Sequence, residues 1–108
     1  MNADEIYREK KFLVKISDLN LDDSDLMVYN STEGMLQGVA DCVFREGGKY
    51  VLLDYKTDRR VTDDILRERY SRQLSLYARA LSMIFGEKIS KGCLYSFSLG
   101  KAIDIELK

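Results

Sequence analysis

The chain has 108 residues, of which 45% are hydrophobic, and its 17 Lys and Arg against 18 Asp and Glu give a net charge of −1. This length suits one domain with a single modest core. No apolar run approaches the roughly 20 residues that a membrane-spanning helix needs, so a soluble chain is expected. The lack of histidine excludes Ser-His-Asp, Cys-His and HExxH sites within these residues. The balanced charge excludes a strongly basic nucleic-acid footprint overall, although local basic patches remain possible.

The two cysteines, Cys42 and Cys93, lie far apart in the sequence. They form neither a CxxC pair nor a four-cysteine ligand set. Their use favours buried free thiols in a reducing cytosol, with a disulfide possible but not needed.

The N-terminal third predicts one strand followed by an acidic loop. Residues 11–16 alternate between apolar and mostly charged side chains, which predicts a half-buried strand. Residues 17–30 are acidic and lack periodicity, which predicts a loop. Residues 18–22 resemble the start of an EF-hand, but Asp23 replaces the required glycine and Tyr29 replaces the closing glutamate. We therefore expect a solvated acidic loop rather than a calcium site.

Two strongly apolar segments, residues 36–45 and 49–56, predict a β-hairpin. Gly47 and Gly48 separate them, and a two-residue Gly-Gly turn favours a hairpin because both positions adopt positive φ readily. Residues whose numbers sum to 95 then face each other, which places Asp41 opposite Asp54. Both faces of the hairpin are mostly apolar, so we expect central strands that are covered on both sides.

The second half predicts one long helix and a second hairpin. Thr62 is a candidate N-cap of a helix over residues 61–85, and Gly86 follows its end. Residues 92–99 and 102–107 predict a closing hairpin, in which Ile103, Ile105 and Leu107 point inward. The order β-β-β-α-β-β predicts a mixed α/β (α+β) domain. The apolar positions expected on the buried helix face are Val61, Ile65, Leu74, Tyr77, Leu81 and Ile84.

An acid-x-Lys triplet carries the candidate chemistry. The chain contains three such triplets, and only Asp54-Tyr55-Lys56 lies inside an otherwise apolar strand, where charges are costly unless paired or metal-bound. The predicted register places Asp41 and Asp54 about 5 Å apart, where like charges destabilise a sheet. Lys56 shares the face of Asp54 because side chains alternate along a strand. One interpretation is a buried salt bridge, which leaves the second acid unexplained; the other is a Mg²⁺ or Mn²⁺ site.

Three segments together resemble the PD-(D/E)XK nuclease superfamily, and more narrowly the RecB-like nuclease of AddA-type helicase–nucleases. They are Gln37-Gly38-Val39-Ala40-Asp41-Cys42, Leu52-Leu53-Asp54-Tyr55-Lys56-Thr57-Asp58 and Gln73-Leu74-Ser75-Leu76-Tyr77. Residues 77–81 and 94–100 extend the likeness, which covers residues 33–107. The resemblance implies a restriction-endonuclease-like core, in which a long helix follows the catalytic hairpin in a central mixed sheet.

The resemblance also implies a role for each motif residue. Asp41 and Asp54 would bind the catalytic Mg²⁺ together with the backbone carbonyl of Tyr55, and Mn²⁺ would substitute. Lys56 would orient a metal-activated water that attacks phosphorus, and would counter the charge that builds on the phosphate. Gln73 and Tyr77 match the QxxxY motif, which supports the positioning of the metal and the DNA phosphate. Without the other motifs, Tyr77 would be interpreted as an ordinary core aromatic and Gln73 as a half-buried helix residue.

A group of arginines follows the predicted catalytic strand. Such a group can track DNA phosphates, or it can form a solvated helix face balanced by nearby acids; the mixed charges favour the second interpretation for most of its members. Its members are Arg59, Arg60, Arg67, Arg69 and Arg72, and all except Arg67 are carried forward as possible DNA contacts.

The chain departs from the family pattern at its start. Relatives of this subgroup usually carry an earlier helix whose His or acid completes the metal site, whereas Glu5 or Glu9 is the nearest substitute here. We therefore expect one nuclease-like domain over residues 1–108, a C-terminal fragment that lacks the first core helix. Its parts are a possible tag or linker (1–10), strands with the catalytic hairpin (11–60), the helix (61–86) and the closing hairpin (91–108).

The resemblance implies a metal-dependent DNA exonuclease domain. It would belong to a bacterial, cytoplasmic and nucleoid-associated helicase–nuclease that processes double-strand breaks for recombinational repair with an AddB-like second subunit. ATP would bind only in the helicase region of the parent, since no GxxxxGK[ST] motif occurs in this chain. One alternative is a catalytically inactive nuclease-like module that binds DNA or a partner protein. Another is a small interaction domain with a buried Lys–Asp pair.

Overall fold

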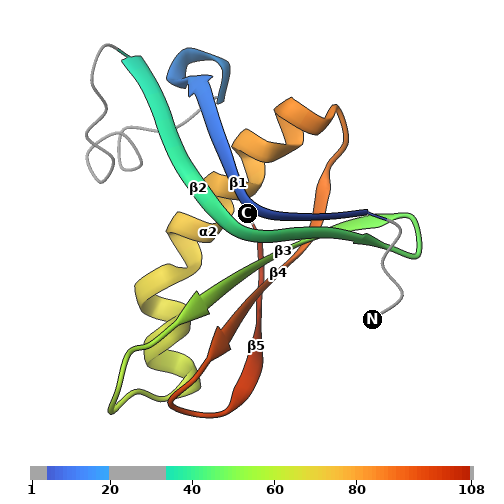
Figure 1. The fold of residues 1–108 in the computed structure, drawn as a ribbon. Coiled ribbons are helices and arrows are strands. Elements are labelled where there is room, and N and C mark those ends of the chain that lie inside the picture. Colours follow the sequence, from blue (N-terminus) through green and yellow to red (C-terminus); the bar gives the residue numbers. More distant parts are fainter. Residues whose placement is uncertain (1–4, 20–33, 108) are drawn as a thin grey trace.

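A five-stranded mixed sheet with one long helix forms the computed structural model, which describes residues 5–19 and 34–107 (Figure 1). The spatial order of the strands follows the chain, from β1 to β5. The predicted α/β class and the order β-β-β-α-β-β are therefore confirmed. The elements are β1 (Glu5–Lys15), the 3₁₀ helix η1 (Ile16–Leu19), β2 (Met35–Glu46), β3 (Lys49–Lys56), α2 (Asp63–Phe85), β4 (Ile89–Ser96) and β5 (Lys101–Ile105).

The predicted hairpin and its register are confirmed. β2 and β3 pair antiparallel from Glu46↔Lys49 to Cys42↔Leu53, so the numbers of paired residues sum to 95. The turn uses positive φ at both glycines, 60° at Gly47 and 78° at Gly48. Continuing this register brings Asp41 of β2 beside Asp54 of β3.

The first strand begins earlier than predicted. β1 starts at Glu5 rather than at residue 11, and residues 5–10, expected as a possible tag or linker, pair with β2. These residues are rich in charge and lack the alternation of a half-buried strand, a composition that an edge strand tolerates. Of the predicted acidic loop at 17–30, residues 17–19 belong to η1 and the rest lies outside the described residues.

β1 and β2 bend together near Glu9 and Asp41 (Figure 1). Tyr7 and Phe12 of β1 both pack against α2, through Phe85 and Tyr77, although an odd number of residues separates them. Side chains alternate along a regular strand, so β1 must turn its face over between these two positions. Glu9, with φ of 53°, makes that turn. The bend leaves Asp41 at the point where β2 changes direction.

The helix has the predicted ends. Thr62 is its N-cap, whose Oγ1 accepts a hydrogen bond from the Ile65 amide at 3.2 Å, and Gly86 closes it at φ of 68°. Two positions expected on the buried face, Ile65 and Ile84, are instead 38% and 42% exposed. Leu66 takes the buried place in the first turn. No helix among residues 5–19 and 34–107 is long and apolar enough to cross a membrane.

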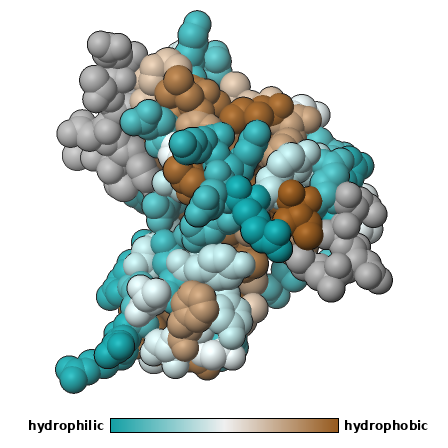
Figure 2. Space-filling view, viewed as in Figure 1, coloured by the Kyte–Doolittle hydropathy of each residue, from teal (hydrophilic) through white to brown (hydrophobic). Residues whose placement is uncertain are grey.

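The expectation that both faces of the central hairpin are covered is wrong for the described residues. Within this part of the chain α2 packs on one face, while Tyr55 of β3 and Phe97 after β4 are 45% and 59% exposed on the other. Figure 2 shows pale and brown side chains over the lower part of this open face. The apolar pattern of both faces therefore exceeded the cover that one helix supplies.

The closing hairpin and both free thiols agree with expectation. β4 runs parallel to β3 and antiparallel to β5, and Ile103 and Ile105 are buried. Cys42 and Cys93 are buried free cysteines, and both pair in register with Leu53. They are thus two strands apart, roughly 10 Å, which is beyond disulfide reach.

Candidate functional site

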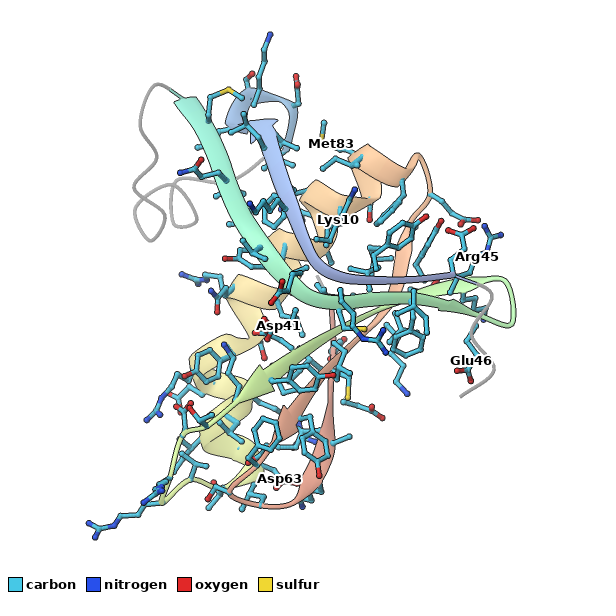
Figure 3. The ribbon with its side chains drawn as sticks, viewed as in Figure 1. Lys10, Asp41, Arg45, Glu46, Asp63 and Met83 are labelled. Carbon is cyan, nitrogen blue, oxygen red and sulfur yellow. The ribbon has the colours of Figure 1, made fainter. Side chains whose placement is uncertain are left out.

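Two carboxylates and one ammonium meet where β2 and β3 separate. The Lys56 Nζ lies 2.9 Å from Asp54 Oδ2, and their side chains are 16% and 15% exposed. The half-buried Asp41 accepts a hydrogen bond from the Tyr55 amide at 2.9 Å through Oδ2, and its carboxyl also bonds to that of Asp54. The structure thus brings together Asp41, Asp54 and Lys56, with Asp41 at the bend of β2 (Figure 3).

The two carboxyls have opposite acidities. Their mutual hydrogen bond, the Tyr55 amide and the Lys56 charge hold the pKa of Asp41 below its ordinary value. Burial, together with the bond to Asp41, raises the pKa of Asp54 to about 6 despite its contact with Lys56. One lysine therefore does not compensate two neighbouring carboxylates, and the surplus negative charge is partly desolvated.

The backbone of Tyr55 adds a further oxygen on the same side. In a strand, the N–H and the C=O of one residue point toward the same neighbouring strand. The Tyr55 N–H reaches Asp41, so its carbonyl also faces β2, beyond Cys42↔Leu53, the last pair of the ladder. Asp41, Asp54 and the Tyr55 carbonyl are therefore oxygen donors at one end of the hairpin.

Two residues that the sequence did not single out, Tyr70 and Asp58, complete the surroundings of Lys56. The Lys56 Nζ lies 3.9 Å from the centroid of the Tyr70 ring. The Tyr70 hydroxyl donates to both Asp58 oxygens, at 2.7 Å and 2.9 Å, and Asp58 also pairs with Arg69. The signal for Tyr70 was its place one turn before Gln73, although in the sequence it appeared only to interrupt the apolar spacing of the helix.

The QxxxY residues face the sheet from the middle of α2. Tyr77 packs edge-on against Phe12, with ring centroids 4.8 Å apart. A Cβ at Gly38 would lie 2.9 Å from the Tyr77 hydroxyl and 2.7 Å from Phe12 Cζ, so glycine is required at this close approach. Gln73 is half-buried one turn earlier on the same side of the helix. These contacts give Tyr77 a packing role beside Asp41.

The arginines do not form one common surface. Arg69 is held by Asp58, while Arg67 bonds to the Asp104 carbonyl and pairs with Asp64. Arg59 and Arg60 are exposed in the loop after β3, and Arg72 is exposed on α2. Of the possible DNA contacts, Arg69 is therefore already engaged in an ion pair.

Neither glutamate of β1 completes the acidic pair. Glu5 accepts hydrogen bonds from Tyr7 and Tyr50 and pairs with Arg45, at the other end of the strand from the carboxyl pair. Glu9 is exposed at the bend. Within residues 5–19 and 34–107, no group of three His, Cys, Asp or Glu gathers around one point.

The donor set nevertheless fits a hard divalent cation. Mg²⁺ prefers oxygen ligands and commonly takes one or two carboxylates, with waters or substrate phosphates completing its shell. Asp41 and Asp54 supply two carboxylates with surplus charge, and Lys56 supplies a cation beside them. The arrangement suits reactions at an anionic centre such as a phosphodiester.

Comparisons with known proteins agree with this geometry. An ATP-dependent helicase/nuclease protein of Clostridium botulinum (strain Alaska E43 / Type E3) is 42% identical over 98 residues, 91% of this chain and 8% of the relative. One of the same name from Exiguobacterium sibiricum is 40% identical over 110 residues, 95% of this chain and 9% of the relative. The chain thus spans less than a tenth of these curated relatives. Residues 4–103 match the PD-(D/E)XK nuclease superfamily, and this chain therefore belongs to that superfamily.

Proposed function

We propose that this chain is a metal-dependent DNA nuclease domain that hydrolyses phosphodiester bonds. The observation that carries the proposal is the contact between Asp41 and Asp54, whose surplus charge leaves the pKa of Asp54 at about 6 beside a lysine. Membership of the nuclease superfamily supports the same chemistry. Mg²⁺ is the proposed ion, and Mn²⁺ substitutes for it.

In this proposal Asp41, Asp54 and the Tyr55 carbonyl hold the ion. The bound ion supplies Lewis-acid activation of water and neutralises charge on the phosphate. Lys56 orients the attacking water and stabilises the negative charge that develops in the transition state. The Tyr55 amide fixes the Asp41 carboxylate through its hydrogen bond, so that this ligand is ordered before the ion binds.

The residues around this group have supporting roles. Tyr77 fixes α2 against β2 next to Asp41, and Gln73 lies on the same helix face, where it helps to position the ion or a DNA phosphate. Arg59, Arg60 and Arg72 contact DNA phosphates from the exposed surface near the site, whereas Arg69 acts within the fold.

For a longer protein of this kind, we propose an exonuclease domain of a cytoplasmic bacterial helicase–nuclease. It processes double-strand DNA ends for recombinational repair together with a second protein chain. The names of the relatives, which describe ATP-dependent helicase/nucleases, support this context. ATP is then used in a helicase region outside this chain.

A Mn²⁺ titration of the 108-residue chain, followed by paramagnetic NMR broadening, tests the proposal directly. We expect broadening to begin at Asp41, Asp54 and Lys56 and to vanish in Asp54→Ala. Glu5→Ala is a matched control, because Glu5 is also a hydrogen-bonded strand acid but lies at the other end of the sheet. Broadening that is absent, or that survives in Asp54→Ala, contradicts the proposed metal site.

A second candidate is a nuclease-like module that binds DNA or a partner protein without cleaving. The absence of a third clustered acid among residues 5–19 and 34–107 favours it. Incubation with labelled DNA and Mg²⁺, with Lys56→Ala in parallel, separates the two functions. DNA binding without cleavage in the wild-type chain, unchanged by removal of the metal, supports the second candidate.

A further inference from the structure

The Lys56 ammonium has two partners of different kinds. Asp54 holds it through an ion pair at 2.9 Å, and the centroid of the Tyr70 ring of α2 lies 3.9 Å away. With its side chain only 16% exposed, Lys56 is partly shielded from water, which strengthens a cation–π contact. The strand that carries the lysine is therefore tied to the helix through the lysine itself.

Asp58 fixes the orientation of the Tyr70 ring. The Tyr70 hydroxyl donates to both oxygens of Asp58, and Arg69, the residue before Tyr70, pairs with the same carboxylate. Asp58 lies two residues after Lys56, so the loop that leaves β3 holds the ring on which the lysine rests. A carboxylate acceptor also draws the phenol proton toward itself and increases the electron density of the ring, which favours a cation on its face.

The two partners of Lys56 respond differently when Asp54 is neutralised. A cation bound at Asp54 competes with the ammonium for the same carboxylate, so the ion pair weakens when the metal site is filled. The Tyr70 ring is not a metal ligand and keeps its position, because Asp58 and Arg69 hold it independently of Asp54. The ring is then the contact that keeps the ammonium at the site.

We propose that Tyr70, fixed by Asp58, is a positioning residue that holds Lys56 at the reaction centre when Asp54 is occupied. This inference rests on the proposed nuclease function for its purpose. Its geometry concerns this chain alone and can be tested without any bound ion.

NMR of the lysine ε-methylene groups in the 108-residue chain gives the direct readout, with Lys56→Arg to assign the signal. A methylene over an aromatic face shifts upfield, so Lys56 should stand apart from the exposed lysines. We expect the shift to persist in Tyr70→Phe, which keeps the ring, and to be lost in Tyr70→Leu. Tyr7→Leu is the matched control, since Tyr7 also bonds a carboxylate and carries Lys10 over its ring. It should move the Lys10 signals and leave those of Lys56 unchanged.

Asp54→Asn then imitates a neutralised Asp54. We expect Lys56 to keep its upfield shift in Asp54→Asn and to move to the position of an exposed lysine in Asp54→Asn/Tyr70→Leu. An unchanged shift in Tyr70→Leu, or a shift lost in Asp54→Asn alone, overturns the proposal. If Tyr70→Leu does not fold, Asp58→Asn serves instead, and a shift equal to that of the wild type counts against it.

The same samples separate this inference from the proposed function. Loss of Mn²⁺ broadening at Asp41 and Asp54 in the wild-type chain withdraws the metal site but leaves the Lys56–Tyr70 result standing. Broadening at those residues, combined with a Lys56 signal that ignores Tyr70, removes the positioning role and retains the metal site.

Discussion

Two clusters of the same chemistry pack against different parts of α2. In each, a tyrosine hydroxyl donates to a carboxylate, an arginine pairs with that carboxylate, and a lysine lies over the tyrosine ring. The Glu5 cluster, at the C-terminal end of α2, consists of Glu5, Tyr7, Lys10, Arg45 and Tyr50. The Asp58 cluster, nearer its start, consists of Lys56, Asp58, Arg69 and Tyr70.

The clusters differ in what lies beside them. Lys10 is 5.6 Å from the centroid of its ring, whereas Lys56 is 3.9 Å from its ring and also pairs with Asp54. Asp54 in turn contacts Asp41, so the Asp58 cluster lies beside two further acids that share one lysine. An aromatic ring between an acid and a lysine is thus ordinary packing, and the adjacent carboxyl pair distinguishes the candidate site.

The largest difference should appear when one acid of each region is neutralised. Asp54→Asn should weaken Mn²⁺ binding by roughly 100-fold, because the affinity of oxygen-ligand sites follows their charged ligands. It should also leave the metal-free fold as stable or more stable, since it removes repulsion with Asp41. Glu5→Gln should leave Mn²⁺ binding unchanged and lower stability, because the pKa of Glu5 is held below its ordinary value by the Tyr7 and Tyr50 hydroxyls. Calorimetric titration and thermal unfolding measure both, and equal Mn²⁺ affinities in the two variants would contradict the assignment.

Between the clusters, Gly38 sets how closely β2 approaches α2. Gly38→Ala should destabilise the fold by about 3 kcal/mol, the upper end of the overpacking range, because its Cβ would overlap Phe12 and Tyr77. Denaturant unfolding measures this free energy. In a Phe12→Leu background, which removes the atom at 2.7 Å, the same substitution should cost clearly less. Equal costs in both backgrounds would show that the overlap with Phe12 is not the cause.

The two regions should also respond to pH in opposite directions. The pKa of Asp54 is raised to about 6 from an unfolded value near 4, so its contribution to stability is present below pH 4 and is lost as the pH rises through 6. We expect the metal-free chain to lose about 2 kcal/mol over this range, and Asp54→Asn to abolish the loss. The lowered pKa of Glu5 acts the other way, with stability lost as the pH falls. Urea unfolding between pH 4 and 7 tests this, and a stability that rises from pH 4 to 6 would refute it.

The parts of the fold that could be predicted from the sequence are those that local rules determine. The Gly47-Gly48 turn and the two-residue period fix the β2–β3 register, and so the meeting of Asp41 with Asp54. Thr62 and Gly86 fix the helix ends in the same local way. These features depend on neighbours in the sequence or on a single tight turn.

The remaining features depend on how α2 docks. Tyr70 meets Lys56 only because the helix crosses the end of β3, and no spacing within the helix reveals that contact. The bend at Glu9 reverses the face of β1, so simple alternation could not extend that strand to Glu5. Cover of the second sheet face likewise depends on what packs there, which the pattern of the strands does not specify.

The smallest expected effect compares the two tyrosine hydroxyls. Tyr70→Phe removes the phenol donor that Asp58 shares with Arg69, and should cost about 1 kcal/mol at pH 7, since the lost bond is to a charged group that is mostly shielded. Tyr7→Phe should cost less, because Glu5 keeps a second phenol donor in Tyr50 at 3.1 Å. Equilibrium unfolding of the two variants measures the difference. A larger loss in Tyr7→Phe would mean that the Glu5 cluster is the more tightly held of the two. The firm seat of Lys56 would then have to come from Asp54 alone, and the two clusters would differ only in the charge beside them.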